Sequence, residues 1–96
     1  MIGEFKTTFW QDFSIADRFG INAIKDTYKR VFDEWKNNTE YVTELVVVLN
    51  WKLWYHWENG NHDVSKIYDE LWKKTENWCY KHLKGNDLEY FIKTID

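Results

Sequence analysis

The apolar residues of this chain recur with a helical period. In three long segments, 22–36, 40–58 and 63–84, they return every three or four residues. This spacing places them on one side of an α-helix, whereas a half-buried strand would alternate strictly between apolar and polar residues. The chain also contains no proline, which suits uninterrupted helices. The sequence therefore predicts an all-α fold built on three long helices.

Two shorter amphipathic segments flank the long ones, at residues 14–19 and 87–94. Ser14 is followed three residues later by Asp17, the spacing of a capping box at a helix start. Gly20 is suited to end this first short helix in the left-handed conformation. We therefore expect a small helical bundle with a short helix at each end.

Residues 1–10 show no clear periodicity of apolar positions. We expect residues 7–10 to be extended and to pack through their aromatic rings. Residues 1–6 are expected to be an added leader or disordered, and they are left out of the fold prediction. With 96 residues, the chain has the length of one domain, and we assign residues 1–96 to it.

The segment from Thr43 to Trp57, TELVVVLNWKLWYHW, is the longest nearly continuous apolar stretch. It is too long for a typical buried strand and contains no glycine or proline, so it is predicted to be the central helix. Placed at about 100° per residue, it shows one main apolar arc, which also takes in His56. The arc consists of Val42, Leu45, Val46, Leu49, Leu53 and Trp57, and we expect it to face the core.

A second apolar stripe lies on the opposite side of this helix. It consists of Val47, Trp51 and Trp54, with Tyr55 beside it. In one interpretation the aromatic segment 9–13 folds over the stripe, and the stripe belongs to the core. In the other the stripe is exposed and binds a partner, because tryptophan and tyrosine are frequent anchors of protein interfaces. The sequence slightly favours the first interpretation and leaves the second open.

Composition and charge narrow the function. Aromatic residues make up 20% of the chain, and the net charge is −3. An acidic balance argues against a nucleic-acid binder, which needs a basic surface. Cys79 is the single cysteine, so an intramolecular disulfide is excluded and a reducing compartment is favoured. Without a signal-peptide pattern or a long apolar run, we expect a cytoplasmic protein that does not span a membrane.

One local motif keeps an alternative function open. Residues 15–21, IADRFGI, are similar to the first helix and turn of a helix-turn-helix. The second helix of that motif would need an apolar residue where Asp26 stands, and its exposed side mixes acidic with basic residues. A tight helix corner is the simpler interpretation. Nucleic-acid association through residues 15–30 is kept as the alternative.

Three further residues were considered as a reactive or metal-binding group. Cys79 and His82 lie one helical turn apart, and His56 could join them if two helices pack in register. Zinc requires three or four converging ligands, and a cysteine nucleophile requires an orienting third group. The spacing requires neither a zinc site nor a cysteine nucleophile. Whether His56, Cys79 and His82 converge in the fold stays open. We therefore assign no catalytic residue, cofactor or metal, and expect a protein without enzymatic activity.

Several stretches resemble a group of small proteins from phages and conjugative elements of gut-dwelling low-GC bacteria. These are TTFWQDFSIADRFG, the EW–N break, ELVVVLNWK and HLKGNDLEYF, which together cover nearly the whole chain. The group has no assigned activity. The resemblance implies a cytosolic accessory protein of a mobile element that acts by binding a protein. The candidate surface is Val47, Trp51, Trp54 and Tyr55, for a protein partner or for a homodimer.

Overall fold

The computed structural model describes the backbone of residues 2–96 and the side chains from residue 8 onward. Within this range the chain forms helices and no strand. The helices are α1 (Ile2–Asp17), α2 (Ile21–Trp35), α3 (Thr39–Glu58), α4 (His62–His82) and α5 (Asn86–Ile95). The predicted all-α bundle is confirmed, and its three long helices lie close to their predicted positions.

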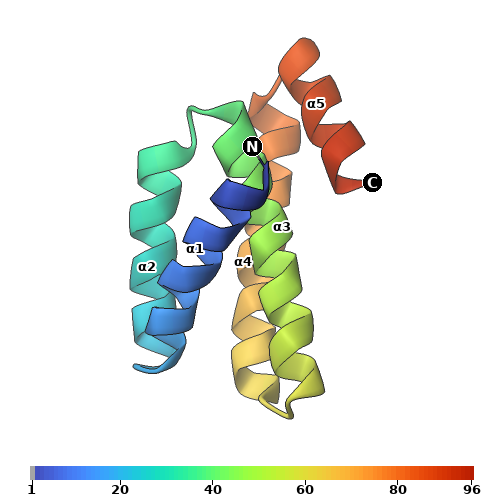
Figure 1. Cartoon of the computed structure of the whole chain (residues 1–96). Coiled ribbons are helices and arrows are strands. Elements are labelled where there is room, and N and C mark those ends of the chain that lie inside the picture. The colour runs from blue at the N-terminus through green and yellow to red at the C-terminus, as the bar shows by residue number, and fades with distance from the viewer. Residues whose placement is uncertain (1) are drawn as a thin grey trace.

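Successive helices run in alternate directions and are joined by short turns (Figure 1). The most extensive packing is between α3 and α4, and α1 packs against both α2 and α3. The last helix, α5, folds back beside the start of α3. Because α2 packs mainly against α1, the first helix connects α2 to the rest of the bundle. None of the described helices has both the length and the apolar character that a membrane crossing requires.

The first helix is longer than predicted. It spans Ile2–Asp17, so the extended conformation expected for residues 7–10 is wrong, and Ser14 lies inside the helix and does not cap it. The physical reason is a stripe that the sequence analysis did not use. Phe9, Phe13 and Ala16 are four and three residues apart and are all buried.

The start of α1 overlaps residues 1–6, which we expected to be an added leader or disordered. The backbone of residues 2–6 is helical, and Met1 lies outside the described residues. Whether this segment is an added leader stays a prediction.

The buried side chains form two clusters. The larger joins α1, α2, α3 and α4, and the smaller lies where α5 covers the other end of the α3–α4 pair. A hydrogen bond of 2.8 Å between the hydroxyl groups of Tyr28 and Thr75 ties α2 to α4 within the larger cluster. These contacts leave one long side of α3 without a neighbouring helix.

The predicted core arc of α3 is correct except at its end. Its first five residues, Val42, Leu45, Val46, Leu49 and Leu53, are buried. Trp57 is 52% exposed because α3 ends one residue later, and one face of its ring stacks on His62 at the start of α4, with centroids 4.3 Å apart. Val48, which was placed outside the arc, is fully buried because α1 packs on that side of α3.

The turn between α1 and α2 depends on Gly20. Its φ of 102° and ψ of −175° lie in a region that is essentially restricted to glycine, and not in the left-handed helical region that we predicted. Gly20 stands at the N-cap position of α2, and its carbonyl oxygen accepts a 3.1 Å hydrogen bond from the backbone N–H of Ile24.

Replacing Gly20 is therefore expected to destabilise the protein through the backbone alone. A Cβ at this position would meet no atom within 4 Å, so no steric clash contributes. Gly20→Ala and Gly20→Asn should each lower the free energy of unfolding by about 1–3 kcal/mol in chemical denaturation. The control Asn22→Ala, at an exposed position inside α2, should change it by less than about 0.5 kcal/mol. A Gly20→Asn variant as stable as the wild type would contradict this account.

Candidate functional site

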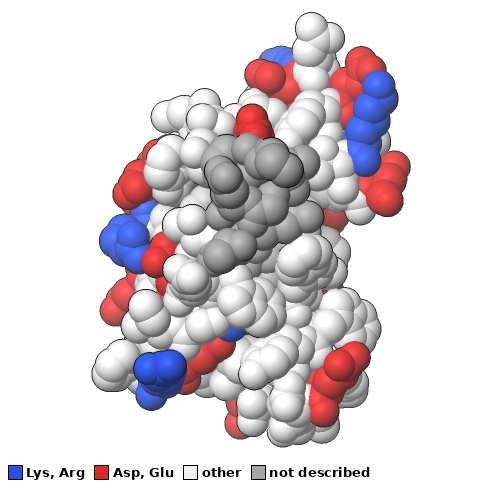
Figure 2. All heavy atoms as spheres, viewed as in Figure 1, with Lys and Arg blue, Asp and Glu red and all other residues white. Residues whose placement is uncertain are grey.

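The outer side of α3 exposes four large aromatic residues. We term Trp51, Trp54, Tyr55 and Trp57 the tryptophan face; their exposed fractions are 48%, 54%, 48% and 52%. Figure 2 shows a broad, largely uncharged surface over the lower half of α3, with an acidic residue at its lower right edge. Of the predicted surface residues, Trp51, Trp54 and Tyr55 are exposed, and Val47 is partly buried beside them.

The aromatic segment 9–13 does not cover Trp51 and Trp54. Phe9 and Phe13 are 2% and 0% exposed, but they are buried between α1 and the core. Trp10 contacts Tyr55 edge-on, with ring centroids 5.5 Å apart. The described part of α1 thus flanks the tryptophan face, and its two central rings, Trp51 and Trp54, are 48% and 54% exposed.

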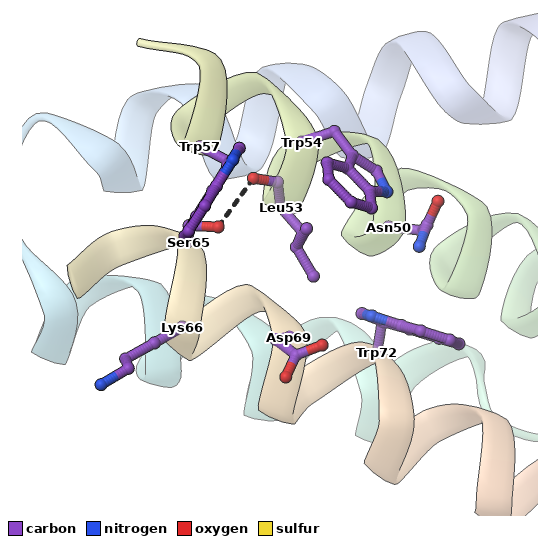
Figure 3. A pocket seen from close by; sticks show the side chains of 8 residues that line it. All are labelled: Asn50, Leu53, Trp54, Trp57, Ser65, Lys66, Asp69 and Trp72. Atoms are coloured by element: carbon purple, nitrogen blue, oxygen red, sulfur yellow. Dashed lines mark hydrogen bonds between the residues drawn. The ribbon is translucent and has the colours of Figure 1, made fainter. Parts of the chain in front are cut away.

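A groove runs along the tryptophan face between α3 and α4 (Figure 3). Its volume is about 510 Å³, and it is lined by Asn50, Leu53, Trp54, Trp57, Ser65, Lys66, Asp69 and Trp72. In Figure 3 Leu53 points into the space between the two helices, and the rings of Trp54 and Trp72 lie across it from each other. The charged residues Lys66 and Asp69 stand on its α4 side. The groove is therefore apolar inside and charged along one rim.

A second hollow continues from this groove toward α5. It measures about 340 Å³, and Trp51, Trp72, Glu76 and Ile95 are among its lining residues. Burial raises the pKa of the Glu76 carboxyl above its usual value. Since Trp72 lines both spaces, the two hollows follow one side of α3 from Trp57 to the region of α5.

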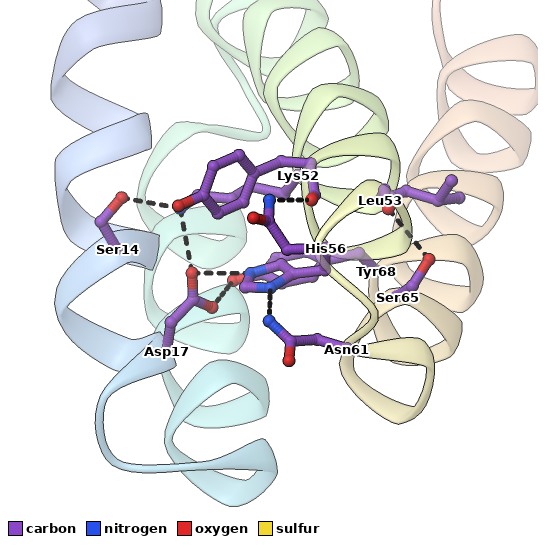
Figure 4. A network of polar contacts seen from close by, with 10 residues as sticks. Ser14, Asp17, Lys52, Leu53, His56, Asn61, Ser65 and Tyr68 are labelled. Atoms are coloured by element: carbon purple, nitrogen blue, oxygen red, sulfur yellow. Dashed lines mark hydrogen bonds and ion pairs between the residues drawn. The ribbon is translucent and has the colours of Figure 1, made fainter.

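A network of polar side chains lies on the α1 side of α3 (Figure 4). The carboxylate of Asp17, at the end of α1, accepts three hydrogen bonds. The donors are Nζ of Lys52 at 2.9 Å, Nε2 of His56 at 2.9 Å and the hydroxyl of Tyr68 at 2.5 Å. Nζ of Lys52 also donates to Oγ of Ser14 at 2.6 Å. One carboxylate therefore joins α1 to both α3 and α4.

The ammonium group of Lys52 is enclosed by aromatic rings. Its side chain is 1% exposed, and Nζ lies 4.0 Å from the ring centroid of Trp10 and 5.4 Å from that of Tyr55. A cation over the face of a ring is attracted to its π electrons, most strongly by tryptophan. Tyr55 thus belongs both to the tryptophan face and to the cover over Lys52.

His56 is held on both of its ring nitrogens. Nε2 contacts Asp17, and Nδ1 lies 3.3 Å from the side-chain nitrogen of Asn61. These contacts fit a neutral ring that donates from Nε2 and accepts at Nδ1. The imidazole also stacks on the Tyr68 ring, with centroids 5.5 Å apart and planes 5° from parallel. Asn61 occupies the N-cap position of α4, but its side chain forms no capping bond.

Tyr68 is the buried hydroxyl of this network. Burial, followed by the hydrogen bond to Asp17 and the negative charge of that carboxylate, raises the pKa of Tyr68. The phenol therefore stays protonated and donates to Asp17.

The network holds three helices together, because its hydrogen bonds join α1 to α3 and α4. A serine 2.6 Å from a lysine could suggest a nucleophile and its base, but here Lys52 donates to the serine and is also paired with Asp17. The grooves at the tryptophan face are lined by other residues. A carboxylate at the C-terminal end of a helix also opposes the helix dipole, so Asp17 must gain its favourable interactions from α3 and α4.

Sequence reasoning identified His56 but missed its partners. Lys52 and His56 are four residues apart and so lie on the same side of α3. A pair of basic residues beside a buried apolar arc is a signal for an acidic partner. The capping-box interpretation of Asp17 obscured this signal, and Tyr68 lies too far away in the sequence for local spacing to reveal it.

The three residues considered for metal binding do not come together. His56 belongs to the network, and Cys79 is fully buried in the smaller core cluster with Val42 and Phe91. His82 stacks on Trp78, with ring centroids 4.7 Å apart. Among the residues whose side chains are described, no group of three or more histidine, cysteine or acidic side chains could hold a metal ion.

The corner at residues 15–21 does not have the geometry of a helix-turn-helix. In that motif the two helices cross at a wide angle, whereas α1 and α2 run antiparallel along one another (Figure 1). Ala16 is 4% exposed at this contact, as expected of a small residue at a tight corner. Asp17 is directed into the polar network, so the motif residues are explained by packing.

Comparison with models of protein families, with curated proteins and with solved structures yields no match to this chain. The resemblance to proteins of mobile elements therefore stays a prediction. The function has to be argued from the geometry of the tryptophan face and its groove.

The polar network predicts a large difference between two aspartates of α1. Asp17→Ala removes the partner of the buried Lys52, whose side chain is 1% exposed, and should lower the free energy of unfolding by about 3 kcal/mol. Asp12→Ala removes only a 4.0 Å contact with the exposed Arg30 and should cost less than about 1 kcal/mol. Chemical denaturation of both variants measures the difference. Equal losses would show that Asp17 does not stabilise the contact between α1 and α3.

The burial of Cys79 predicts an unreactive thiol. Burial, with a smaller effect of Glu76, raises the pKa of Cys79 to about 12. The folded protein should therefore react slowly with a thiol reagent at neutral pH, and the unfolded protein in denaturant should react fully. Because the folded state binds this proton more tightly, its contribution to stability is present at neutral pH and is lost as the pH rises above about 9. Rapid labelling of the folded protein at neutral pH would contradict this placement.

Proposed function

We propose that this protein is a non-enzymatic interaction module that binds protein through its tryptophan face and the adjoining groove. The observation that carries the proposal is the exposure of Trp51, Trp54 and Trp57 beside an apolar groove of about 510 Å³. Tryptophan is the residue most enriched at the energetic centres of interfaces, where its ring fills a pocket on the partner. The tryptophan face supplies such rings and a groove on one surface.

The exposed rings of Trp51, Trp54 and Trp57 contribute little to the core of the single chain. Leu45, Leu49 and Leu53 fill the inner side of α3, and α1 covers the side of Val48. Exposed apolar surface of this kind favours association, so a chain that worked alone would gain from polar residues at these positions. A partner gives the rings a physical role.

The biological setting follows from the sequence resemblance. An accessory protein of a phage or conjugative element would act in the host cytoplasm by binding a protein of the host or of the element. The net charge of −3 and the largely uncharged surface over α3 favour a protein partner over a nucleic acid, which requires a basic surface.

A comparison of two variants in a host-cell lysate tests this proposal. Trp51→Ala/Trp54→Ala removes the centre of the tryptophan face, and Phe19→Ala removes a ring that is 76% exposed in the α1–α2 turn. A protein retained by the wild type should bind the double variant at least tenfold more weakly, since two interface anchors are lost, and should bind Phe19→Ala unchanged. A circular dichroism spectrum like that of the wild type verifies that the double variant is folded. Equal retention by all three forms would refute a role for the tryptophan face.

A further inference from the structure

The exposed side of α3 carries the spacing of a helix-pairing seam. Val47, Trp51 and Trp54 follow one another at intervals of four and three residues, and Glu58 follows after four more. This alternation of three and four keeps a stripe of residues facing a second helix. Trp51 and Trp54 occupy the middle of the stripe and are both about half exposed. The surface is therefore shaped to receive a helix lying along α3.

The same surface holds a ridge and a hollow side by side. We term the exposed rings of Trp51 and Trp54 the ridge, and the groove between α3 and α4, which Trp54 also lines, is the hollow. A volume of about 510 Å³ lies within the range of about 300–1,000 Å³ that is typical of pockets for drug-sized molecules, so the groove can receive an indole ring. A two-fold axis places the ridge of each copy over the hollow of the other, which makes such a surface self-complementary.

The charges on the rim fit the same symmetry. Lys66 and Asp69 lie on the α4 side of the groove, three residues apart, and have opposite signs. In an antiparallel two-fold pair, Lys66 of one protomer faces Asp69 of its partner, and the contact occurs twice. Asp69 is also 3.1 Å from Lys73 of its own helix through Oδ2, which leaves Oδ1 to face the partner. A partner with a single-sign surface would be repelled by one of the two rim residues.

The apolar area is what a small dimer requires. With exposed fractions of about one half, the four rings of the tryptophan face offer roughly 400–500 Å² per protomer. A stable interface buries about 800 Å² on each side, and about 60% of it is apolar. With Tyr55 at the edge of the contact, the rings supply most of the apolar share of a standard interface.

From this seam, shape, charge pattern and area, we propose that the occupant of the tryptophan face is a second copy of this chain. Two protomers pair antiparallel along α3, with the ridge of each in the α3–α4 groove of the other. This inference rests on the proposed function and names its partner. In the pair, Trp51, Trp54 and Trp57 become buried, and Tyr55 lies at the edge of the interface beside Trp10.

The mass of the purified full chain across about a thousandfold range of concentration tests the pairing. Sedimentation velocity should show a shift from the 11.9 kDa monomer to twice that mass as the concentration rises. Trp51→Ala/Trp54→Ala should raise the dissociation constant at least tenfold, and Phe19→Ala should leave it unchanged. Fluorescence should become more accessible to a soluble quencher on dilution, because half-exposed tryptophans leave the interface.

Charge reversal tests the two-fold arrangement, and it does so even if the double tryptophan variant fails to fold. Lys66→Asp and Asp69→Lys should each weaken self-association by about tenfold, because each places like charges opposite one another in two places. Mixing the two variants in equal amounts should restore association, since every facing pair is then attractive. A mixture that associates no better than its components would overturn the antiparallel arrangement.

The outcomes separate this inference from the proposed function. A chain that stays monomeric throughout, yet retains a host protein through Trp51 and Trp54, would overturn the second copy and leave the interaction module standing. A monomer that retains no protein through these residues would overturn both. A dimer that persists unchanged in the folded Trp51→Ala/Trp54→Ala variant would overturn the location of the interface.

Discussion

The fold depends on one shared carboxylate. Asp17 ends α1 and accepts hydrogen bonds from Lys52 and His56 of α3 and from Tyr68 of α4. Since α2 packs chiefly on α1, this carboxylate also fixes α2 to the α3–α4 pair. Apolar burial provides most of the driving force, but it is not directional. The polar contacts set the position of α1 along α3, because an unmatched charge at this depth would be costly.

The position of α1 decides which residues of α3 are exposed. The central helix is apolar around most of its circumference, and α4 and α1 bury two of its sides. On the α1 side, Val48 and Lys52 are inaccessible, and Trp10 reaches Tyr55 at the edge. The strip that carries Trp51 and Trp54 stays about half exposed. The exposed aromatic surface is thus a consequence of how few helices a chain of 96 residues can place around its middle one.

Local periodicity predicted the long helices because each contains its own apolar stripe. It also located Trp51 and Trp54 on one stripe, but the exposure of that stripe depends on α1, which lies far away in the sequence. The prediction was wrong where tertiary contacts override local signals. Ser14 and Asp17 have the spacing of a helix start, yet Asp17 ends α1 because its partners lie on α3 and α4. The apolar periodicity of α3 places Trp57 among the core residues, but the helix ends one residue later and the ring stays half exposed.

Tyr55 connects the two surfaces of α3. It borders the exposed tryptophans on one side, and on the other it rests against Trp10 above the ammonium group of Lys52. A partner bound to the tryptophan face would therefore contact Tyr55, which shields the ammonium group of Lys52. If a partner bound the tryptophan face more tightly when α1 is docked, thermodynamic reciprocity would require that the partner also stabilises the docking of α1. Partner binding at the tryptophan face and the docking of α1 would then be thermodynamically coupled.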